Sequence, residues 1–150
     1  MDVVGSKFDG AGRPGDFRWM IEQPDYARAL FIFNDNEEQF LAYRRDPTGR
    51  AGCSAGGGNA AIRPFRCSDP PRAAGIPTGR HGRGYDGLTP AVQEVIDDAL
   101  VVVRDLLATG NYDQVVYSAG AADGDLGTGI FQVGEDVRRH IVAQLQTFAT

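Results

Sequence analysis

Short apolar runs along the chain predict buried strands. Residues 29–34 (ALFIFN) are apolar up to an Asn-Asp-Asn sequence, and residues 113–118 (DQVVYS) form a similar run. Such runs, bounded by turn residues, are typical of strands with both faces covered. Residues 73–79 (AAGIPTG) add a shorter apolar stretch that we expect to end in a Pro-Thr-Gly turn. Residues 59–66 (NAAIRPFR) predict a strand at a sheet edge, because Pro64 cannot donate to a ladder.

Two later segments repeat apolar residues at helical spacing. Thr89 is a good N-cap, Pro90 suits the first helical position, and Gly110 suits the position just beyond the helix. The apolar stripe between them comprises Val92, Val95, Ile96, Ala99, Leu100, Val103, Leu106 and Leu107. A C-terminal helix is indicated by Val137, Ile141, Leu145 and Phe148. This order of helices and strands predicts an α/β or α+β layer fold with a small mixed sheet.

The start of the chain has a different character. Residues 1–26 are rich in Gly, Asp and Pro, and they predict an irregular arm. Its apolar residues, which indicate packing on its own domain or on a second subunit, are Phe8, Phe17, Trp19, Met20 and Ile21. We therefore divide the chain into an N-terminal arm, residues 1–27, and one domain, residues 28–150.

Composition narrows the class of protein. The 150 residues are 42% apolar and 23% charged, which is ordinary for one globular domain. The sequence has neither a run long enough for a membrane span nor the pattern of a signal peptide, so we expect a cytoplasmic protein. Cys53 and Cys67 are expected to be reduced thiols there. His81 and His140 are too scattered to predict a metal site, and no cofactor is indicated.

The arginines are concentrated in one part of an acidic chain. The net charge is −5, yet residues 44–83 carry eight arginines against Asp46 and Asp69. The net charge of residues 44–83 is therefore +6, and that of the rest of the chain is −11. One positive patch on an acidic body favours a compact anionic ligand over a nucleic acid polymer, and guanidinium groups bind phosphate in a bidentate manner. The alternative is that these arginines are solvated loop charges.

A glycine triplet lies inside the arginine-rich window. Gly56, Gly57 and Gly58 can take positive φ and let successive backbone N–H groups converge on one anion, with Asn59 next in sequence. The pattern matches neither a P-loop nor G-x-G-x-x-G. A flexible loop before a strand is the alternative interpretation.

Further ligand candidates follow the predicted strands. Asn34 comes at the end of the first strand, where open α/β sheets place ligands, although turn chemistry also explains it. The hydroxyl of Thr78 and the amide of Gly79 are candidates for a ribose or phosphate. Tyr85 is a candidate base-stacking ring, and core packing is its other use.

The loop AGAADGDLGTGIF and the helix after it add the last candidates. Asp125, Gly127 and Thr128 lie in this loop. Arg138 lies in the first turn of the predicted helix, where a cation is unfavourable against the helix dipole, and this suggests an external anion. We assign no catalytic residue, because no nucleophile elbow or paired acid and base is recognisable.

Several of these motifs carry a resemblance to a known family. FNDNEEQF, GGGNAAIRPF, GIPTG, YDQVVYSA and LGTGIF, followed by a final helix, resemble small phage-encoded Thoeris anti-defence sponges over about residues 30–148. The resemblance implies an oligomeric α/β protein of the host bacterial cytoplasm. It also implies that the protein sequesters cyclic ADP-ribose signals made by TIR enzymes without cleaving them; some members of the family also take cyclic oligonucleotides.

A second resemblance is to the macro domain. The glycine triplet and the segment GIPTGRHGRGYDGL look similar to its phosphate loop and its later glycine turn. The segment between these motifs is far shorter here than in macro domains, and FNDN would have to serve as the catalytic asparagine stretch. This resemblance implies an ADP-ribose binder or hydrolase.

A protein-docking module without a nucleotide ligand is the remaining alternative. Both resemblances indicate the same ligand class, so we expect a non-enzymatic nucleotide-binding domain. It would bind neither nucleic acid polymer nor membrane, and it would form a homo-oligomer. The predicted ligand-binding residues are Asn34, Gly56, Gly57, Gly58, Asn59, Arg63, Thr78, Gly79, Tyr85, Asp125, Gly127, Thr128 and Arg138.

Overall fold

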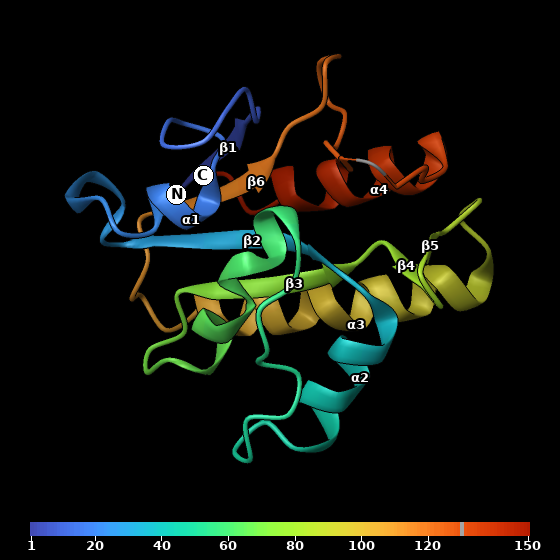
Figure 1. Cartoon of the computed structure of the whole chain (residues 1–150), viewed down its shortest axis with the longest axis horizontal. Coiled ribbons are helices and arrows are strands. Elements are labelled where there is room, and N and C mark those ends of the chain that lie inside the picture. The colour runs from blue at the N-terminus through green and yellow to red at the C-terminus, as the bar shows by residue number, and fades with distance from the viewer. Residues whose placement is uncertain (130) are drawn as a thin grey trace.

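A parallel sheet forms the centre of the molecule (Figure 1). The computed structural model describes residues 1–129 and 131–150. In that part of the chain, four parallel strands are arranged in the order β1-β6-β2-β3. They are β1 (Asp2–Ser6), β2 (Ala29–Asp35), β3 (Ala73–Pro77) and β6 (Gln114–Ser118). The predicted α/β class is confirmed.

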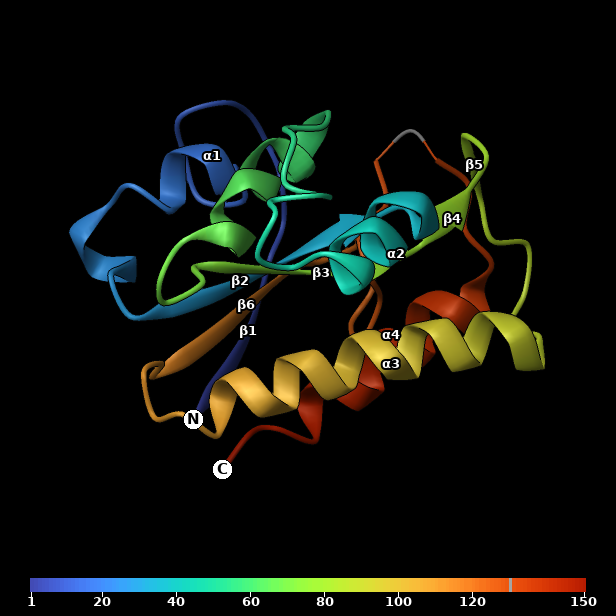
Figure 2. The same cartoon turned by 90° about the horizontal axis from the view of Figure 1, so that it is seen from below.

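Helical segments cover both faces of this sheet (Figure 2). One face carries α1 (Phe17–Met20) and the 3₁₀ helix η2 (Gly58–Cys67). The opposite face carries α3 (Pro90–Leu107) and α4 (Glu135–Gln146). The remaining helices are η1 (Pro24–Tyr26) and α2 (Glu37–Arg45).

Strand β2 has a core on each side because its apolar run is continuous. Leu30 and Ile32 belong to the larger core with α3 and α4. Phe31 and Phe33 point the other way and pack in the core with Phe17 and its neighbours. Successive side chains of a strand alternate between faces, so an unbroken apolar run suits a strand covered on both sides.

Local sequence explains where the helices begin. The side chain of Asn36 accepts a hydrogen bond from Gln39 N at the start of α2, at 2.8 Å. Thr89 does the same for Val92 N at the start of α3, and Pro90 is its first residue, as predicted. Such side-chain caps satisfy backbone donors that have no partner inside the helix.

Three segments differ from their prediction. Residues 59–66 lie in η2 and not in an edge strand. The predicted Pro-Thr-Gly turn is absent: after β3 the chain continues through Thr78 into β4 (Gly79–Arg80), which pairs antiparallel with β5 (Arg83–Gly84). Residues 2–6 of the predicted irregular arm form β1, which pairs in register with β6.

The first residues of the arm are tied to the far end of the chain. The N-terminal amino group of Met1 donates to Thr150 Oγ1 at 2.6 Å, and Thr150 N donates to Met1 O at 3.1 Å. Phe17, Met20 and Ile21 are buried against β2. The segment is thus an integral part of the sheet and its core.

Within residues 1–129 and 131–150, no helix is both long enough and apolar enough to cross a membrane.

Candidate functional site

The carboxyl ends of the four parallel strands lie along one edge of the sheet. The connection after β2 includes α2, whose Phe40 packs in the larger core, and η2, which lies on the other face; the connection after β6 leads to α4 on the face of the larger core (Figure 2). Open α/β sheets bind ligands at the carboxyl ends of neighbouring strands whose connections lead to opposite faces. The edge between β2 and β6 is therefore the candidate site.

On one side of this edge, the loop after β6 is fixed to the end of β2. Asn34 Nδ2 donates to Gly127 O at 2.7 Å. Gly127 N in turn donates to Ser118 O, the last residue of β6, at 2.9 Å. Thr128, next to Gly127, is half-buried. The structure thus brings together three predicted site residues, Asn34, Gly127 and Thr128.

On the other side, a buried ion cluster follows directly from the end of β2. Arg63 Nε lies 3.1 Å from Asp35 Oδ1, and Arg66 Nη1 lies 2.7 Å from Asp35 Oδ2. The side chains of all three residues are at most 6% exposed. Asn36 N also donates to Asp35 Oδ1, at 2.9 Å. Arg63, predicted as a direct phosphate ligand, is thus held by a carboxylate of its own chain.

The cluster carries one more positive charge than negative. Carbonyl oxygens take part of the excess: Arg63 Nη1 donates to Ser54 O, and Arg66 donates to Gly52 O and Gln39 O. Both guanidinium groups also make cation–π contacts with Phe33: Cζ of Arg63 lies 5.7 Å from the ring centroid, and Cζ of Arg66 lies 5.3 Å from it. Burial lowers the pKa of Arg66, and Asp35 opposes that change. Arginine stays protonated in proteins, so the cluster stays cationic.

The glycine triplet lies against this cationic cluster. A Cβ atom on Gly56 would come within 2.7 Å of Arg63 Nη1, so only glycine allows the loop this close. Gly58 has a φ of +56° and, like Gly57, is exposed. No acceptor for Arg63 Nη2 is found among the residues that the structure describes. The glycine loop thus lies next to a buried cluster with excess positive charge.

A disulfide joins the two sides of the glycine loop. Cys53 and Cys67 are bonded, with their Cα atoms 6.2 Å apart, so the prediction of two reduced thiols is wrong. The bridge connects the segment before the triplet to the last residue of η2. It therefore helps to hold the loop over Arg63 and Arg66.

Asn59 has a structural role in the same region. Its Oδ1 accepts from Phe17 N at 3.0 Å, and its Nδ2 donates to Gly15 O at 3.1 Å. Asn59 thus ties the glycine loop to the segment that follows β1, and this contact explains why an amide follows the triplet.

Three other predicted ligand residues are internal. Thr78 is buried, and its N–H and hydroxyl both donate to Asp35 O. Gly79 is buried and pairs with Gly84 in the β4–β5 hairpin. Tyr85 is only 5% exposed, and its hydroxyl donates to Glu37 Oε1 at 2.8 Å. Its ring packs in the larger core and offers no open face to a base, contrary to the predicted stacking role.

Arg138 also has protein partners. Its Nε donates to Asp125 Oδ1 at 2.8 Å, and its Nη1 donates to Val133 O. The cation in the first turn of α4 is therefore compensated by Asp125, a second predicted site residue. This pair braces the loop after β6 against α4, and its charge is largely neutralised.

The eight arginines of the positive window divide into two groups. Arg63, Arg66 and Arg72 have protein acceptors in the interior. The exposed group comprises Arg44, Arg45, Arg50, Arg80 and Arg83.

The pairing of Asp35 with Arg63 and Arg66 was not predicted from the sequence. The signal was the spacing of Arg63 and Arg66: three residues apart, they share one side of a 3₁₀ helix but point to opposite faces of a strand. Because residues 59–66 were predicted as a strand, the two arginines were not expected to meet one carboxylate.

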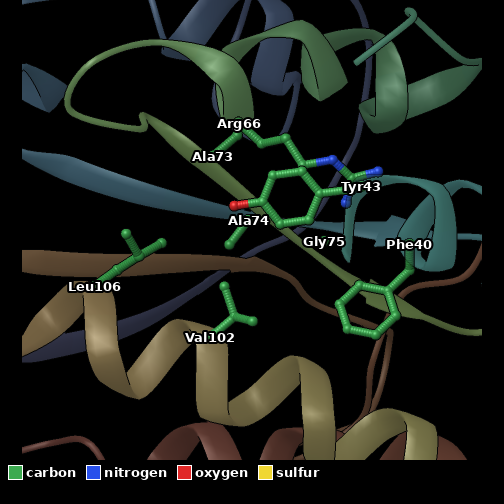
Figure 3. Close-up of a pocket in the computed structure, with 8 residues that line it drawn as sticks. All are labelled: Phe40, Tyr43, Arg66, Ala73, Ala74, Gly75, Val102 and Leu106. Atoms are coloured by element: carbon green, nitrogen blue, oxygen red, sulfur yellow. The ribbon is translucent and has the colours of Figure 1, made fainter. Parts of the chain in front are cut away.

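A small cavity lies beside Arg66 of the ion cluster, between α2, β3 and α3 (Figure 3). It has a volume of about 10 Å³, enough for one water molecule at most. Phe40 and Tyr43 of α2, Arg66, and Val102 and Leu106 of α3 surround it beside β3. An adjoining surface groove of about 310 Å³ lies between α2 and α3. The cavity is a packing gap and holds no ligand-sized space.

Across the described ranges, 1–129 and 131–150, no group of three or more His, Cys, Asp or Glu residues could hold a metal ion. Comparisons with protein-family models, with curated proteins and with solved structures gave no significant match.

Proposed function

We propose that the protein binds the phosphate groups of an adenine nucleotide between the glycine loop, residues 56–59, and the loop after β6, residues 119–129. The observation that carries this proposal is the buried cluster of two guanidinium groups and one carboxylate directly beneath Gly56. The side chains that carry the excess positive charge are buried, so salt screens this charge only weakly. An anion above it would complete the charge balance.

The glycine loop supplies the complementary chemistry. Gly57 and Gly58 are exposed, and a Cβ atom at either position would meet nothing within 4 Å. A phosphate oxygen can therefore approach the backbone of both residues closely. Backbone N–H groups and a buried guanidinium together favour an anion more strongly than either does alone.

The position of the proposed phosphate site favours a diphosphate ligand over a single small anion. Asp35 and Asn34 are consecutive residues that point to opposite faces of β2: one holds the arginine cluster and the other holds Gly127. The two loops thus flank the same strand end. A ligand that contacts both loops must be longer than a single small anion, and a nucleotide diphosphate of the cyclic ADP-ribose class, implied by the resemblance to sponges, meets that requirement.

Binding without cleavage is supported by the state of the nearby side chains. Asp35 is paired with two arginines, Glu37 accepts from Tyr85, and Asp125 is paired with Arg138. A carboxylate that accepts a hydrogen bond or forms an ion pair is a weaker base than a free one, so these three side chains are poor candidates for a general base. The proposed function is therefore sequestration of an intact cyclic nucleotide signal.

The macro-domain alternative would require FNDN to supply catalytic asparagines. Asn34 is bonded to Gly127, and Asn36 caps α2. Both amides already have structural partners, so hydrolysis is the weaker candidate.

A charge placed on the glycine loop tests the proposal. Gly57 has a φ of −82°, which any residue adopts, and open space around it, so Gly57→Asp and its isosteric control Gly57→Asn should both fold. We expect Gly57→Asp to weaken binding of linear and cyclic ADP-ribose by about tenfold or more in calorimetric titrations, because two like charges meet at close range. Gly57→Asn should bind far better than Gly57→Asp.

The matched pair Thr128→Asp and Thr128→Asn tests the opposite loop in the same way. If both aspartate variants bind as tightly as their asparagine controls, no phosphate lies between these loops and the proposal is overturned.

A further inference from the structure

An aromatic ring stands exposed at the same edge of the sheet. Phe8 comes two residues after the end of β1 and is 54% exposed, more than any other large apolar residue that the structure describes. Single exposed rings are common on protein surfaces. Phe8 differs because of the contacts that connect its loop to the proposed phosphate site.

The segment after β1 is packed closely at Gly15. A Cβ atom on Gly15 would come within 2.7 Å of Phe8 Cα and would also meet the carbonyl of Lys7. Gly15 N donates to Met20 Sδ at 3.2 Å, and Gly12 N donates to Asp16 Oδ2 at 2.9 Å. The backbone that carries Phe8 is therefore held in place while its ring faces solvent.

Asn59 connects this segment to the glycine loop. Its amide bonds both Gly15 O and Phe17 N, and it follows the glycine triplet directly. The chain of contacts thus runs from the proposed phosphate site at Gly57 and Gly58 through Asn59 and Gly15 to Phe8. The backbone that carries Phe8 is thus connected to the glycine loop by direct contacts.

We propose that Phe8 is the platform on which the base of the ligand stacks, so that the site selects phosphorylated ligands that carry an aromatic base. This inference rests on the proposed function and adds the part of the ligand that lies beyond the phosphates. Stacking of a base on an aromatic side chain is tolerant of base identity and is lost on truncation to alanine. Phe8 takes the role that Tyr85, being buried, does not fill.

Phe131 is the competing ring. It is 50% exposed and follows the loop of residues 119–129, where its N–H donates to Thr128 O at 3.3 Å. Its segment continues into Gln132 and Val133, which lie against Gly84 of the β4–β5 hairpin. Asn59 has no contact of this kind with that segment in the described residues, so we assign the base to Phe8.

The test compares ligands with and without a base. Titrations of ADP-ribose, ribose 5-phosphate and inorganic pyrophosphate are measured for the wild type and for Phe8→Ala, Phe8→Trp and Phe131→Ala. Leu41→Ala serves as the matched control, because Leu41 is 40% exposed on α2, outside both glycine-containing loops. We expect Phe8→Ala to weaken ADP-ribose binding by about fivefold or more and to leave pyrophosphate binding unchanged. Phe8→Trp should restore ADP-ribose binding.

Each other outcome counts against the inference in a distinguishable way. Loss of base preference in Phe131→Ala and not in Phe8→Ala would assign the base to the opposite loop. Equal losses for ADP-ribose and pyrophosphate in Phe8→Ala would make Phe8 a structural residue only. Wild-type protein that binds none of the three ligands would overturn the proposed function, and this inference with it.

Discussion

Asp35 is the residue that organises the interior of the candidate site. Its carboxylate, fully buried, holds Arg63 and Arg66 on one side, and its backbone carbonyl accepts from Thr78 on the other. The two buried arginines depend on this carboxylate for charge compensation. Removing one partner of a buried ion pair leaves charge without compensation.

Replacement of Asp35 by asparagine should therefore be strongly destabilising. We expect Asp35→Asn to lower the free energy of unfolding by about 3–5 kcal/mol in urea denaturation. The control is Asp113→Asn, which removes an exposed pair with Arg28 at 3.7 Å and should cost less than about 1 kcal/mol. A similar decrease in the free energy of unfolding in the two variants would contradict a larger contribution of the buried cluster to stability.

Tyr85 gives a prediction on pH. Burial, and then its hydrogen bond to Glu37, raise the pKa of Tyr85 above its ordinary value of about 10. Above that pH the unfolded chain releases the phenol proton and the folded chain retains it, so unfolding becomes more favourable as pH rises. The stabilising contribution of Tyr85 is complete below about pH 10 and declines above it.

Urea titrations between about pH 8 and pH 11 test this linkage. Tyr85→Phe should lose less stability across that range than the wild type does. At neutral pH the free energy of unfolding of Tyr85→Phe should be about 1 kcal/mol lower than that of the wild type, because the variant lacks the hydrogen bond to Glu37. Parallel curves for the two proteins would contradict a raised pKa at Tyr85.

Among the elements, η2 shows where local sequence stops being sufficient. Several of the regular elements are predicted from the sequence, because each has its own local pattern of apolar residues. The strands at residues 29–34 and 113–118 have continuous apolar runs, and the helices near residues 90–107 and 135–146 have apolar residues at helical spacing. In η2 the apolar residues Ala60 and Ile62 alternate as in a strand, and the partner of its arginines, Asp35, lies far away in sequence. Only the folded arrangement identifies the element.

The disulfide at the end of η2 makes a separate prediction. Cys53 and Cys67 close a loop with a sequence separation of 14, and a loop of that length should contribute about 3 kcal/mol by restricting the unfolded chain. The double variant Cys53→Ser/Cys67→Ser should lose this amount in denaturation measured without reductant. Alkylation of the wild type, unfolded without reductant, should modify neither cysteine. An unfolding midpoint that reductant leaves unchanged would contradict a stabilising bridge.

At the scale of the whole molecule, one strand end connects two loops that are far apart in sequence. The position of Asn34 at the carboxyl end of a strand is predicted from the sequence, whereas the strand order that brings the two glycine-containing loops to one strand end is not. The internal partners of Arg63, Arg138, Thr78 and Tyr85 do not follow from the sequence, because each is a long-range contact. A cytoplasmic location and a homo-oligomer remain predictions.

Capture and release of nucleotide is the most direct test of the account. Purified protein is mixed with cyclic ADP-ribose isomers or linear ADP-ribose, freed of unbound nucleotide and denatured by heat, and the released compound is identified by mass spectrometry. We predict that the wild type releases the intact cyclic nucleotide in stoichiometric amount and that Gly57→Asp releases little. Release of a cleaved product would indicate catalysis instead of sequestration, and release of no nucleotide would contradict the central claim and favour a protein-docking module.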